Sequence, residues 1–293
     1  GSYRVGIVGL SWITSEPSPP GSHPVLGDAA PHSHLSALAA IPSADVVAGC
    51  DIVPEARELF LQRWEGTWPG GKAYADYAEM IRRENLDGIC VATPDNLHGD
   101  VVRMAADAGI RAIFCEKPIS THLADVDSMI EAIERNGAVA SVNHTRRWNP
   151  SYVAARETVR AGAIGDLVTI VVNFGGERAM LWRNQSHFLD LICFLAESDP
   201  AWVIAELEPG YEEYGTAYRG DGGRNPDLEP SLNAYIGFRN GVRAFLGGMK
   251  HSTPQITVDL RGSTARIAVD DQTATLIRGT DDGLATTPIV PKG

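Results

Sequence analysis

The sequence predicts an α/β protein of two domains, the first a doubly wound parallel sheet and the second an α+β domain. Short apolar strand patterns alternate with helical patterns as far as about Trp148, which is typical of parallel strands covered on both faces. Beyond that point strands follow one another with few helices, which predicts one antiparallel or mixed sheet. A chain of 293 residues is also too long for one ordinary core. We therefore predict domains over residues 1–148 and 149–293.

The elements of the first domain each have a local signal. Pro54 suits the first turn of a helix because that position needs no N–H donor, and Gly109 and Gly137 suit helix ends. Right-handed crossovers between the strands then give a doubly wound sheet. The predicted strands are 3–10, 44–51, 86–92, 112–116 and 138–143, and the predicted helices are 32–41, 54–64, 76–83, 97–108 and 123–136.

The elements of the second domain follow the same reasoning. Asn240-Gly241 between two apolar strands predicts a hairpin, because both residues tolerate positive φ. Residues 210–230 have no periodicity and predict a long loop, of a length that is usually functional or disordered. The predicted helices are 150–161 and 187–196, and the predicted strands are 167–174, 202–208, 232–238, 242–249, 256–260, 265–269 and 274–277.

Composition excludes several classes of protein. A net charge of -12 argues against a nucleic-acid partner, which needs a basic footprint. No apolar run reaches the roughly 18 residues of a membrane span, and the first residues enter a strand pattern without a leader. The cysteines are Cys50, Cys90, Cys115 and Cys193, and none forms a close pair. We expect buried, reduced thiols and a cytoplasmic protein without a membrane partner.

The end of the first strand has part of a dinucleotide fingerprint. Gly9 fits the glycine of the tight turn, Ser11 occupies the place of the second glycine, and the third glycine is absent. An insertion over residues 12–31 follows, in which Trp12 and several prolines are interpreted as a lid over the cofactor. Asp51 ends the second strand, where a carboxylate binds the adenosine ribose and repels a 2′-phosphate, so NAD is favoured over NADP. The alternative for Asp51 is the N-cap of the helix at Pro54.

Two later strand ends add candidate cofactor residues. Thr93, Pro94, Asn96 and His98 follow a strand and would border the ribose and the nicotinamide; an ordinary helix start is the alternative. Lys117 follows the next strand. The carboxyl edge of such a sheet is where ligands bind.

In the second half, His187 and Asp190 are three residues apart and share one face of a helix. The carboxylate would favour the protonated imidazole, whereas the helix start disfavours it. Asp190 is also a candidate for binding substrate.

These residues resemble the glucose–fructose oxidoreductase / inositol dehydrogenase family (Gfo/Idh/MocA). The matching stretches are Val5-Gly-Ile-Val-Gly9, Cys50-Asp51, Gly88-Ile-Cys-Val-Ala-Thr-Pro-Asp-Asn-Leu-His98, Cys115-Glu-Lys-Pro-Ile119, Asn143-His-Thr-Arg-Arg-Trp-Asn-Pro150, the helix at His187–Asp190 and Leu260-Arg-Gly-Ser-Thr-Ala-Arg266. The resemblance covers nearly the whole chain. It implies a Rossmann domain, a second domain built on a large open and mostly antiparallel sheet, and assembly into dimers or tetramers through that sheet. It also implies NAD(P)-dependent chemistry at a hydroxyl of a sugar, a cyclitol or a related compound.

The resemblance assigns chemistry to single residues. Lys117 is the first candidate for proton transfer or for holding the substrate hydroxyl, because burial beside a cationic nicotinamide lowers the pKa of an amine. His187 is the second, and Glu116 would position Lys117 or contact the cofactor. The alternatives are a structural Lys117–Glu116 pair and a capping or core role for His187.

The substrate pocket departs from the family pattern. Arg183 occupies the place where the family often carries an aspartate, so Arg183 or Asn184, next to Trp182, would bind an oxygen-rich or acidic substrate. Arg146 would meet substrate or form an interdomain ion pair. His23, His32 and His34 lack a supporting set of ligands, so we expect no metal.

We therefore predict an NAD-dependent oxidoreductase acting on a sugar, cyclitol or sugar acid. Two alternatives are a redox-neutral epimerase or lyase that retains its NAD, and a degenerate protein that binds a dinucleotide or sugar without catalysis. The chain ends soon after residue 277, which is early for the family, so we expect a final element to be missing.

Overall fold

The computed structural model describes residues 1–17, 31, 33–215 and 218–291. The described chain divides into two compact units, one ending at Asn143 and the other beginning at His144. Within these described residues, no helix is long and apolar enough to cross a membrane.

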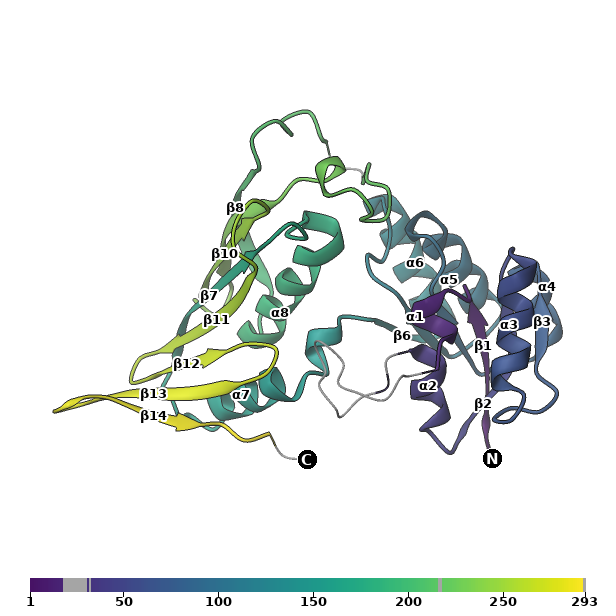
Figure 1. Ribbon diagram of the computed structural model, residues 1–293, viewed down its shortest axis with the longest axis horizontal. Helices are drawn as coiled ribbons and strands as arrows, with labels where there is room; N and C mark the ends of the chain where they lie inside the picture. The colour runs from purple at the N-terminus through teal and green to yellow at the C-terminus, as the bar shows by residue number, and fades with distance from the viewer. Residues whose placement is uncertain (18–30, 32, 216–217, 292–293) are drawn as a thin grey trace. The chain divides into compact units, whose positions relative to one another are not determined.

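The first unit is a parallel sheet of six strands in the order β3-β2-β1-β4-β5-β6. All neighbouring strands are parallel, and the winding reverses between β1 and β4, which makes this the switch point of a doubly wound fold. The strands are β1 (Tyr3–Val8), β2 (Ala44–Cys50), β3 (Lys72–Tyr74), β4 (Gly88–Val91), β5 (Ala112–Cys115) and β6 (Val139–Val142). The helices are α1 (Trp12–Ser15), α2 (His34–Ala39), α3 (Pro54–Trp64), α4 (Tyr77–Arg83), α5 (His98–Asp107) and α6 (Leu123–Asn136) (Figure 1).

Two hydrophobic clusters cover the two faces of this sheet. Ile7 of β1 packs with Leu35 of α2 and Phe60 of α3. Its neighbour Val8 packs with Met80 of α4 and with residues of α5 and α6. Successive strand residues point to opposite faces, so α2 and α3 cover one face and α4, α5 and α6 cover the other.

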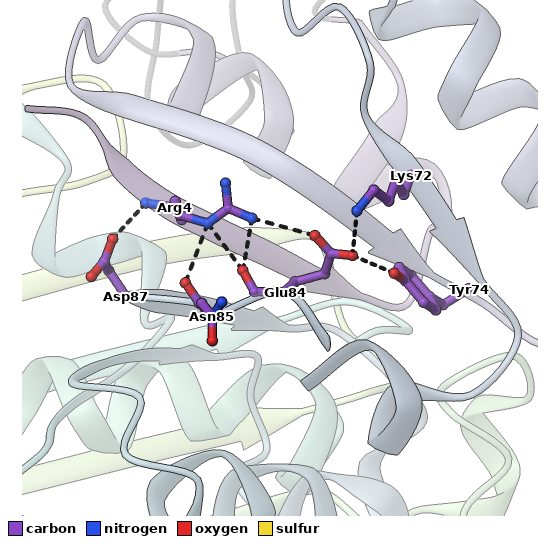
Figure 2. A network of polar contacts seen from close by, with 6 residues as sticks. All are labelled: Arg4, Lys72, Tyr74, Glu84, Asn85 and Asp87. Carbon is purple, nitrogen blue, oxygen red and sulfur yellow. Dashed lines mark hydrogen bonds and ion pairs between the residues drawn. The ribbon is translucent and has the colours of Figure 1, made fainter. Parts of the chain in front are cut away.

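A polar network lies where β1 and β4 begin, at the amino end of the sheet (Figure 2). The carboxylate of Glu84 is buried and pairs with Lys72 Nζ at 2.9 Å and Arg4 Nη2 at 3.3 Å. The Tyr74 hydroxyl donates to the same carboxylate. Burial raises the pKa of Glu84, but Tyr74, Lys72 and Arg4 outweigh it and hold that pKa below its ordinary value. The bond to Glu84 raises the pKa of Tyr74 to about 12.

The second unit is a mixed sheet of eight strands in the order β14-β13-β12-β11-β7-β10-β9-β8. Only β7 and β10 pair in parallel, and the remaining pairs are antiparallel. The strands are β7 (Leu167–Gly175), β8 (Pro200–Leu207), β9 (Leu232–Phe238), β10 (Arg243–Met249), β11 (Gln255–Gly262), β12 (Arg266–Val269), β13 (Ala274–Thr280) and β14 (Gly283–Pro288).

Helices α7 (Pro150–Arg160) and α8 (Ser186–Ala196) pack on the same face of this sheet (Figure 1). On β8, β9 and β10, aromatic side chains lie outside this core. Tyr235 and Phe245 stack with their centroids 4.5 Å apart, and the Trp202 ring meets Tyr235 edge-on. Phe245 is 41% exposed and Ile204 is 67% exposed.

The structure confirms the predicted fold class. Helices over 54–64 and 123–136 begin and end as predicted, and Gly241 has φ +92 at the predicted hairpin. The helix predicted over 32–41 is shorter, His34–Ala39, because Ser33 caps its first turn. Strands β3 and β14 were not predicted. Lys72–Tyr74 is too short to show a period, and the side chains of Gly283–Pro288 are exposed on both faces.

Candidate active site

Four adjacent strands of the first unit end at the predicted cofactor residues. In the order β2, β1, β4 and β5, the residues that follow are Asp51, Gly9, Thr93 and Lys117. The strands are parallel, so these residues share the carboxyl edge of the sheet. That edge includes the switch point between β1 and β4, where dinucleotides bind in this fold.

Gly9 makes the first turn at this edge possible. Its φ is +92, and a Cβ placed there would lie 2.4 Å from the carbonyl oxygen of Ala92 at the end of β4. Ser11 then caps α1 without a side-chain bond, and α1 ends after one turn at Ser15. Trp12 is 68% exposed. Residues 18–30 of the predicted lid, with His23 among them, lie outside the described residues, as does His32.

Asp51 ties the end of β2 to this turn. Its Oδ2 accepts from Leu10 N at 2.8 Å, and its Oδ1 accepts from Val53 N at 2.9 Å. Val53 is the N-cap of α3 and that helix has no side-chain cap, so the alternative of an Asp51 helix cap is not observed. Carboxylate oxygens have two lone pairs each, which leaves Asp51 able to accept from ribose hydroxyls.

The turn after β4 presents a buried hydroxyl. Thr93 Oγ1 has no hydrogen-bond partner in the part of the chain that the structure describes, as expected of a group that meets a ligand. Pro94 precedes a short 3-10 turn, in which Asn96 is exposed. The ring of His98 is fully buried, with Nδ1 2.9 Å from Pro118 O and Nε2 3.0 Å from Thr93 O. Both nitrogens face main chain, and we reassign His98 from direct cofactor contact to positioning.

Glu116 and Lys117 follow β5, and the Lys117–Pro118 peptide bond is cis. Glu116 Oε1 lies 2.8 Å from His34 Nε2 and accepts from Asn143 Nδ2 at 2.8 Å, and Oε2 accepts from the Lys117 main-chain N–H at 3.2 Å. Burial raises the pKa of Glu116, but the His34 bond outweighs it and lowers that pKa. Burial disfavours the charged His34 ring, yet Cys90 and Glu116 raise its pKa to about 10.

Three substrate candidates of the second unit, Trp182, Arg183 and Asn184, lie on one π-helical turn, Leu181–Gln185, directly before α8. Trp182 Nε1 and Asn184 Oδ1 are buried and have no hydrogen-bond partner among the described residues. The turn therefore offers one unused donor and one unused acceptor beside Arg183. Buried polar groups are normally paired, so these two atoms suit a hydroxyl-bearing ligand.

Glu229 anchors this turn. Its buried carboxylate accepts from the main-chain N–H groups of Trp182 and Arg183, the latter at 2.8 Å. Lys250, which is 3% exposed, donates to Glu229 O at 2.8 Å and pairs with Glu208 at 2.8 Å. The end of the predicted 210–230 loop, at Glu229, thus packs on the turn that carries the candidate residues, and Glu229 was not identified from the sequence.

His187 follows in the first turn of α8. Its ring meets that of His144 edge-on, with centroids 5.8 Å apart. Asp190 is engaged by Arg147, whose Nε and Nη2 each donate to it at 2.8 Å, and His144 Nε2 lies 4.0 Å from Asp190. The carboxylate of Asp190 was expected to favour the protonated ring of His187, but it is already paired with the Arg147 guanidinium. His144 is a second imidazole near this residue, and it was not identified from the sequence.

Arg146 is occupied within the second unit. Its Nε and Nη2 donate to Asp271 at 3.0 and 2.8 Å, and its guanidinium lies 4.1 Å from the centroid of the Phe188 ring. The side chain is 8% exposed. This geometry corrects the expected interdomain ion pair, since Arg146 and Asp271 belong to the same unit, and substrate contact by Arg146 stays a prediction.

Neither a metal-binding cluster nor a disulfide is found among the described residues. Within the described ranges, no group of three or more potential ligands could hold a metal ion. Cys50, Cys90 and Cys115 are buried and free, and Cys193 is free and half-buried.

The comparisons with known proteins decide the family. The model of an oxidoreductase family with an NAD-binding Rossmann fold, GFO_IDH_MocA, matches residues 3–144. A scyllo-inositol 2-dehydrogenase (NAD(+)) from Bacillus subtilis is 31% identical over 250 residues, which cover 74% of this chain and 69% of that protein. The chain belongs to the GFO_IDH_MocA family.

Some relatives match over a smaller share of their length. A D-apiose dehydrogenase from Paraburkholderia graminis is 37% identical over 133 residues, which are 45% of this chain and 34% of that enzyme. The chain thus spans about a third of the length of that relative. The structure of an oxidoreductase domain protein from Kribbella flavida has a TM-score of 0.77 at 18% identity and covers 98% of this chain and 80% of that one, which is a likeness of fold. Of the candidate residues, Gly9, Asp51 and Lys117 fall inside the family match and His187 falls outside it.

Proposed function

We propose that this protein is an NAD-dependent oxidoreductase that transfers a hydride between the nicotinamide and a hydroxyl-bearing carbon of a sugar, cyclitol or sugar acid. One observation carries the proposal. A lysine held by a buried network stands at the carboxyl edge of a doubly wound sheet, beside its switch point, in a member of an NAD-binding family. Inositol and apiose dehydrogenases among the relatives support the substrate class.

The residues at this edge fit a dinucleotide. The Gly9 turn has no Cβ to block it, Thr93 offers an unused hydroxyl, and Asp51 presents carboxylate oxygens to ribose hydroxyls. The carboxylate would also repel a 2′-phosphate, which favours NAD over NADP. When bound, the nicotinamide supplies the hydride acceptor or donor.

Lys117 and His187 are the proposed proton-transfer groups. As a hydride leaves a carbinol carbon, the hydroxyl proton must also leave, and a positioned base with a pKa near working pH does this best. In this proposal Lys117 Nζ takes or holds the hydroxyl proton, and His187 exchanges it or orients the hydroxyl. Asp190, tied to Arg147, stays a candidate for contact with substrate through its remaining lone pairs.

The turn at Leu181–Gln185 supports a substrate rich in oxygen. Trp182 Nε1 would donate to a substrate hydroxyl, and Asn184 Oδ1 would accept from one. Arg183 adds a guanidinium, which suits a carboxylate because its fork matches two oxygens. We therefore place sugar acids beside neutral polyols in the substrate class.

NADH fluorescence and activity with a panel of polyols, sugars and sugar acids test the function. We expect saturable NADH binding in the wild type. In Lys117→Met, kcat falls by about 10²- to 10⁴-fold, the usual contribution of a general base, with NADH binding unchanged. Lys117→Arg keeps the charge but cannot release a proton, so it should be equally slow. Absent NADH binding at millimolar concentration, or a Lys117→Met variant with wild-type kcat, would overturn the proposal.

A redox-neutral epimerase or lyase is the second candidate. Ser11 in place of a glycine and the single-turn α1 make an atypical cofactor turn, which would suit a retained NAD. Co-purified NAD and turnover without added cofactor would favour this reading. NADH binding without any turnover would instead favour a degenerate binding protein.

We further propose that a second copy of this chain covers the aromatic side chains around Tyr235 and Phe245, which lie outside the core of the second unit. Exposed apolar clusters of this kind mark interaction sites, and light scattering would show a dimer or tetramer. Free Cys50, Cys90 and Cys115 support a reducing, cytoplasmic location.

A further inference from the structure

We propose that His34, acting through Glu116, is a positioning residue for Lys117. The inference rests on the proposed role of Lys117 in proton transfer. His34 is the first residue of α2, and Ser33 caps that helix by accepting from Ser36 N. The imidazole is thus fixed by a helix end and reaches a residue 82 positions away in the sequence, with Nε2 2.8 Å from Glu116 Oε1.

Glu116 connects His34 to the main chain of Lys117. Its carboxylate makes bonds on both oxygens directly after β5: Oε1 contacts His34 and accepts from Asn143, and Oε2 accepts from the main-chain N–H of Lys117. The pair is largely withdrawn from water, with His34 10% and Glu116 16% exposed. A hydrogen bond between charged groups is stronger than a neutral one. The bond to His34 therefore holds the Glu116 carboxylate in one orientation.

The groups that face His34 favour its charged form. Burial alone would lower the pKa of the imidazole, and Phe114 contributes an uncharged ring edge 5.5 Å from its centroid. Cys90 and Glu116 reverse the effect and raise the pKa to about 10. At neutral pH the imidazolium therefore donates to Glu116.

The peptide that carries Lys117 is held on its other side as well. His98 Nδ1 lies 2.9 Å from the carbonyl oxygen of Pro118. Residues 116 and 118 are thus each tied to a buried imidazole, and Lys117 lies between them. A displacement of about 1 Å at a reacting group costs about 100-fold in rate, so a proton-transfer lysine at the end of a strand requires such support.

The experiment compares His34→Leu, which removes the donor, with His34→Gln, whose amide nitrogen can replace Nε2. His122→Leu is the control, because His122 is an exposed histidine of the same unit whose ring Nδ1 lies 3.0 Å from the Thr121 hydroxyl and not at the end of β5. The lysines are Lys72, Lys117, Lys250 and Lys292, so ¹³C-dimethylation gives a resolved NMR signal for Lys117 in the protein without substrate.

We expect His34→Leu to shift or broaden the Lys117 signal and to lower kcat about 100-fold, with KM for NAD within about twofold of wild type. His34→Gln should restore most of both, and His122→Leu should change neither. If His34→Leu fails to fold, Glu116→Gln removes the charged acceptor and should move the same signal.

Wild-type Lys117 signals in folded His34→Leu and Glu116→Gln would overturn the positioning role. The NMR readout needs no turnover, so it separates the two proposals. If His34→Leu shifts the Lys117 signal but the wild type oxidises no substrate, the proposed function is wrong and the positioning role stands. If the wild type is active but the signal in His34→Leu is unshifted, the positioning role is wrong and the proposed function stands.

Discussion

Glu84 provides the sharpest stability prediction, because its carboxylate is 2% exposed and anchors three elements of the first unit (Figure 2). Glu84→Gln keeps the shape and one acceptor oxygen but removes the charge. Arg4 retains its bonds to the Glu84 carbonyl oxygen at 2.7 and 3.0 Å. The variant therefore isolates the charged interactions with Lys72, Tyr74 and the Arg4 Nη2 atom.

The magnitude follows from exposure. Lys72 is 61% and Arg4 42% exposed, so water screens those pairs and each contributes about 0.5 kcal/mol. The Tyr74 bond to a charged group contributes about 2 kcal/mol. Since glutamine retains part of the last bond, the net loss should be about 2 kcal/mol. That corresponds to a fall of about 6 °C in Tm.

The pH dependence has a definite sign. The pKa of Glu84 is lowered in the folded state, so its stabilisation is complete above the pKa of the unfolded chain, about 4.3. It is lost as pH falls through the lower folded pKa. The gap between wild type and Glu84→Gln should therefore be full at pH 7 and should shrink at about pH 3.5.

Calorimetry at both pH values measures the gap, and hydrogen exchange in β1 and α4 assigns it to the first unit. Glu79→Gln is the matched control on the same helix, because its pair with Arg83 is exposed on both sides and should cost less than about 1 kcal/mol. A Glu84→Gln variant no less stable than Glu79→Gln, or an equal gap at both pH values, would refute the reasoning.

Two further predictions concern charged residues with contrasting roles. Asp51→Asn should weaken NADH binding about tenfold, equal to about 1.4 kcal/mol. It should also reduce the preference for NADH over NADPH, because the carboxylate that repels the 2′-phosphate is gone. Fluorescence titration with both cofactors measures the two affinities, and an unchanged ratio between them would contradict the prediction. Arg146→Met should lower the stability of the second unit by about 3 kcal/mol, because the largely buried Asp271 carboxylate loses its charged partner and keeps the Tyr152 hydroxyl as a donor. KM for substrate should stay within about twofold of wild type if Arg146 makes no direct contact with substrate. Urea denaturation and kinetics test it together, and a raised KM at unchanged stability would return Arg146 to the substrate site.

The predicted fold depended on signals that are local in sequence. Pro54 at a helix start and Gly137, with φ +62 at a helix end, set boundaries that tertiary packing did not move. Where the backbone departs from the regular helix and strand periods, the sequence carries no signal that predicts its conformation. The π-helical turn before α8 is an example, since its extra residue per turn is stabilised by Glu229, 46 positions from Arg183.

The candidate site divides in the same way. Asp51 and Lys117 were found because each directly follows an apolar strand, and strand ends are predictable. His34 and His144 were not predicted as site residues, because their contacts are with residues distant in the sequence that no local pattern specifies. His34 contacts Glu116, and His144 contacts His187. Arg146 shows the opposite error, since its position at a strand exit suggested an interdomain ion pair, whereas its partner Asp271 belongs to the same unit.

The two edges of the first sheet separate stability from chemistry. At the amino edge, the charge of Glu84 is paired with side chains of the same unit and its side chain is 2% exposed, so it is closed to a ligand. At the carboxyl edge, the charges of His34 and Glu116 are also paired, but Glu116 also holds the main chain of Lys117, and the same edge carries an unused Thr93 hydroxyl. Substitutions at the amino edge should therefore change Tm with little effect on kcat. Conservative substitutions at the carboxyl edge should change kcat or cofactor affinity with little effect on Tm.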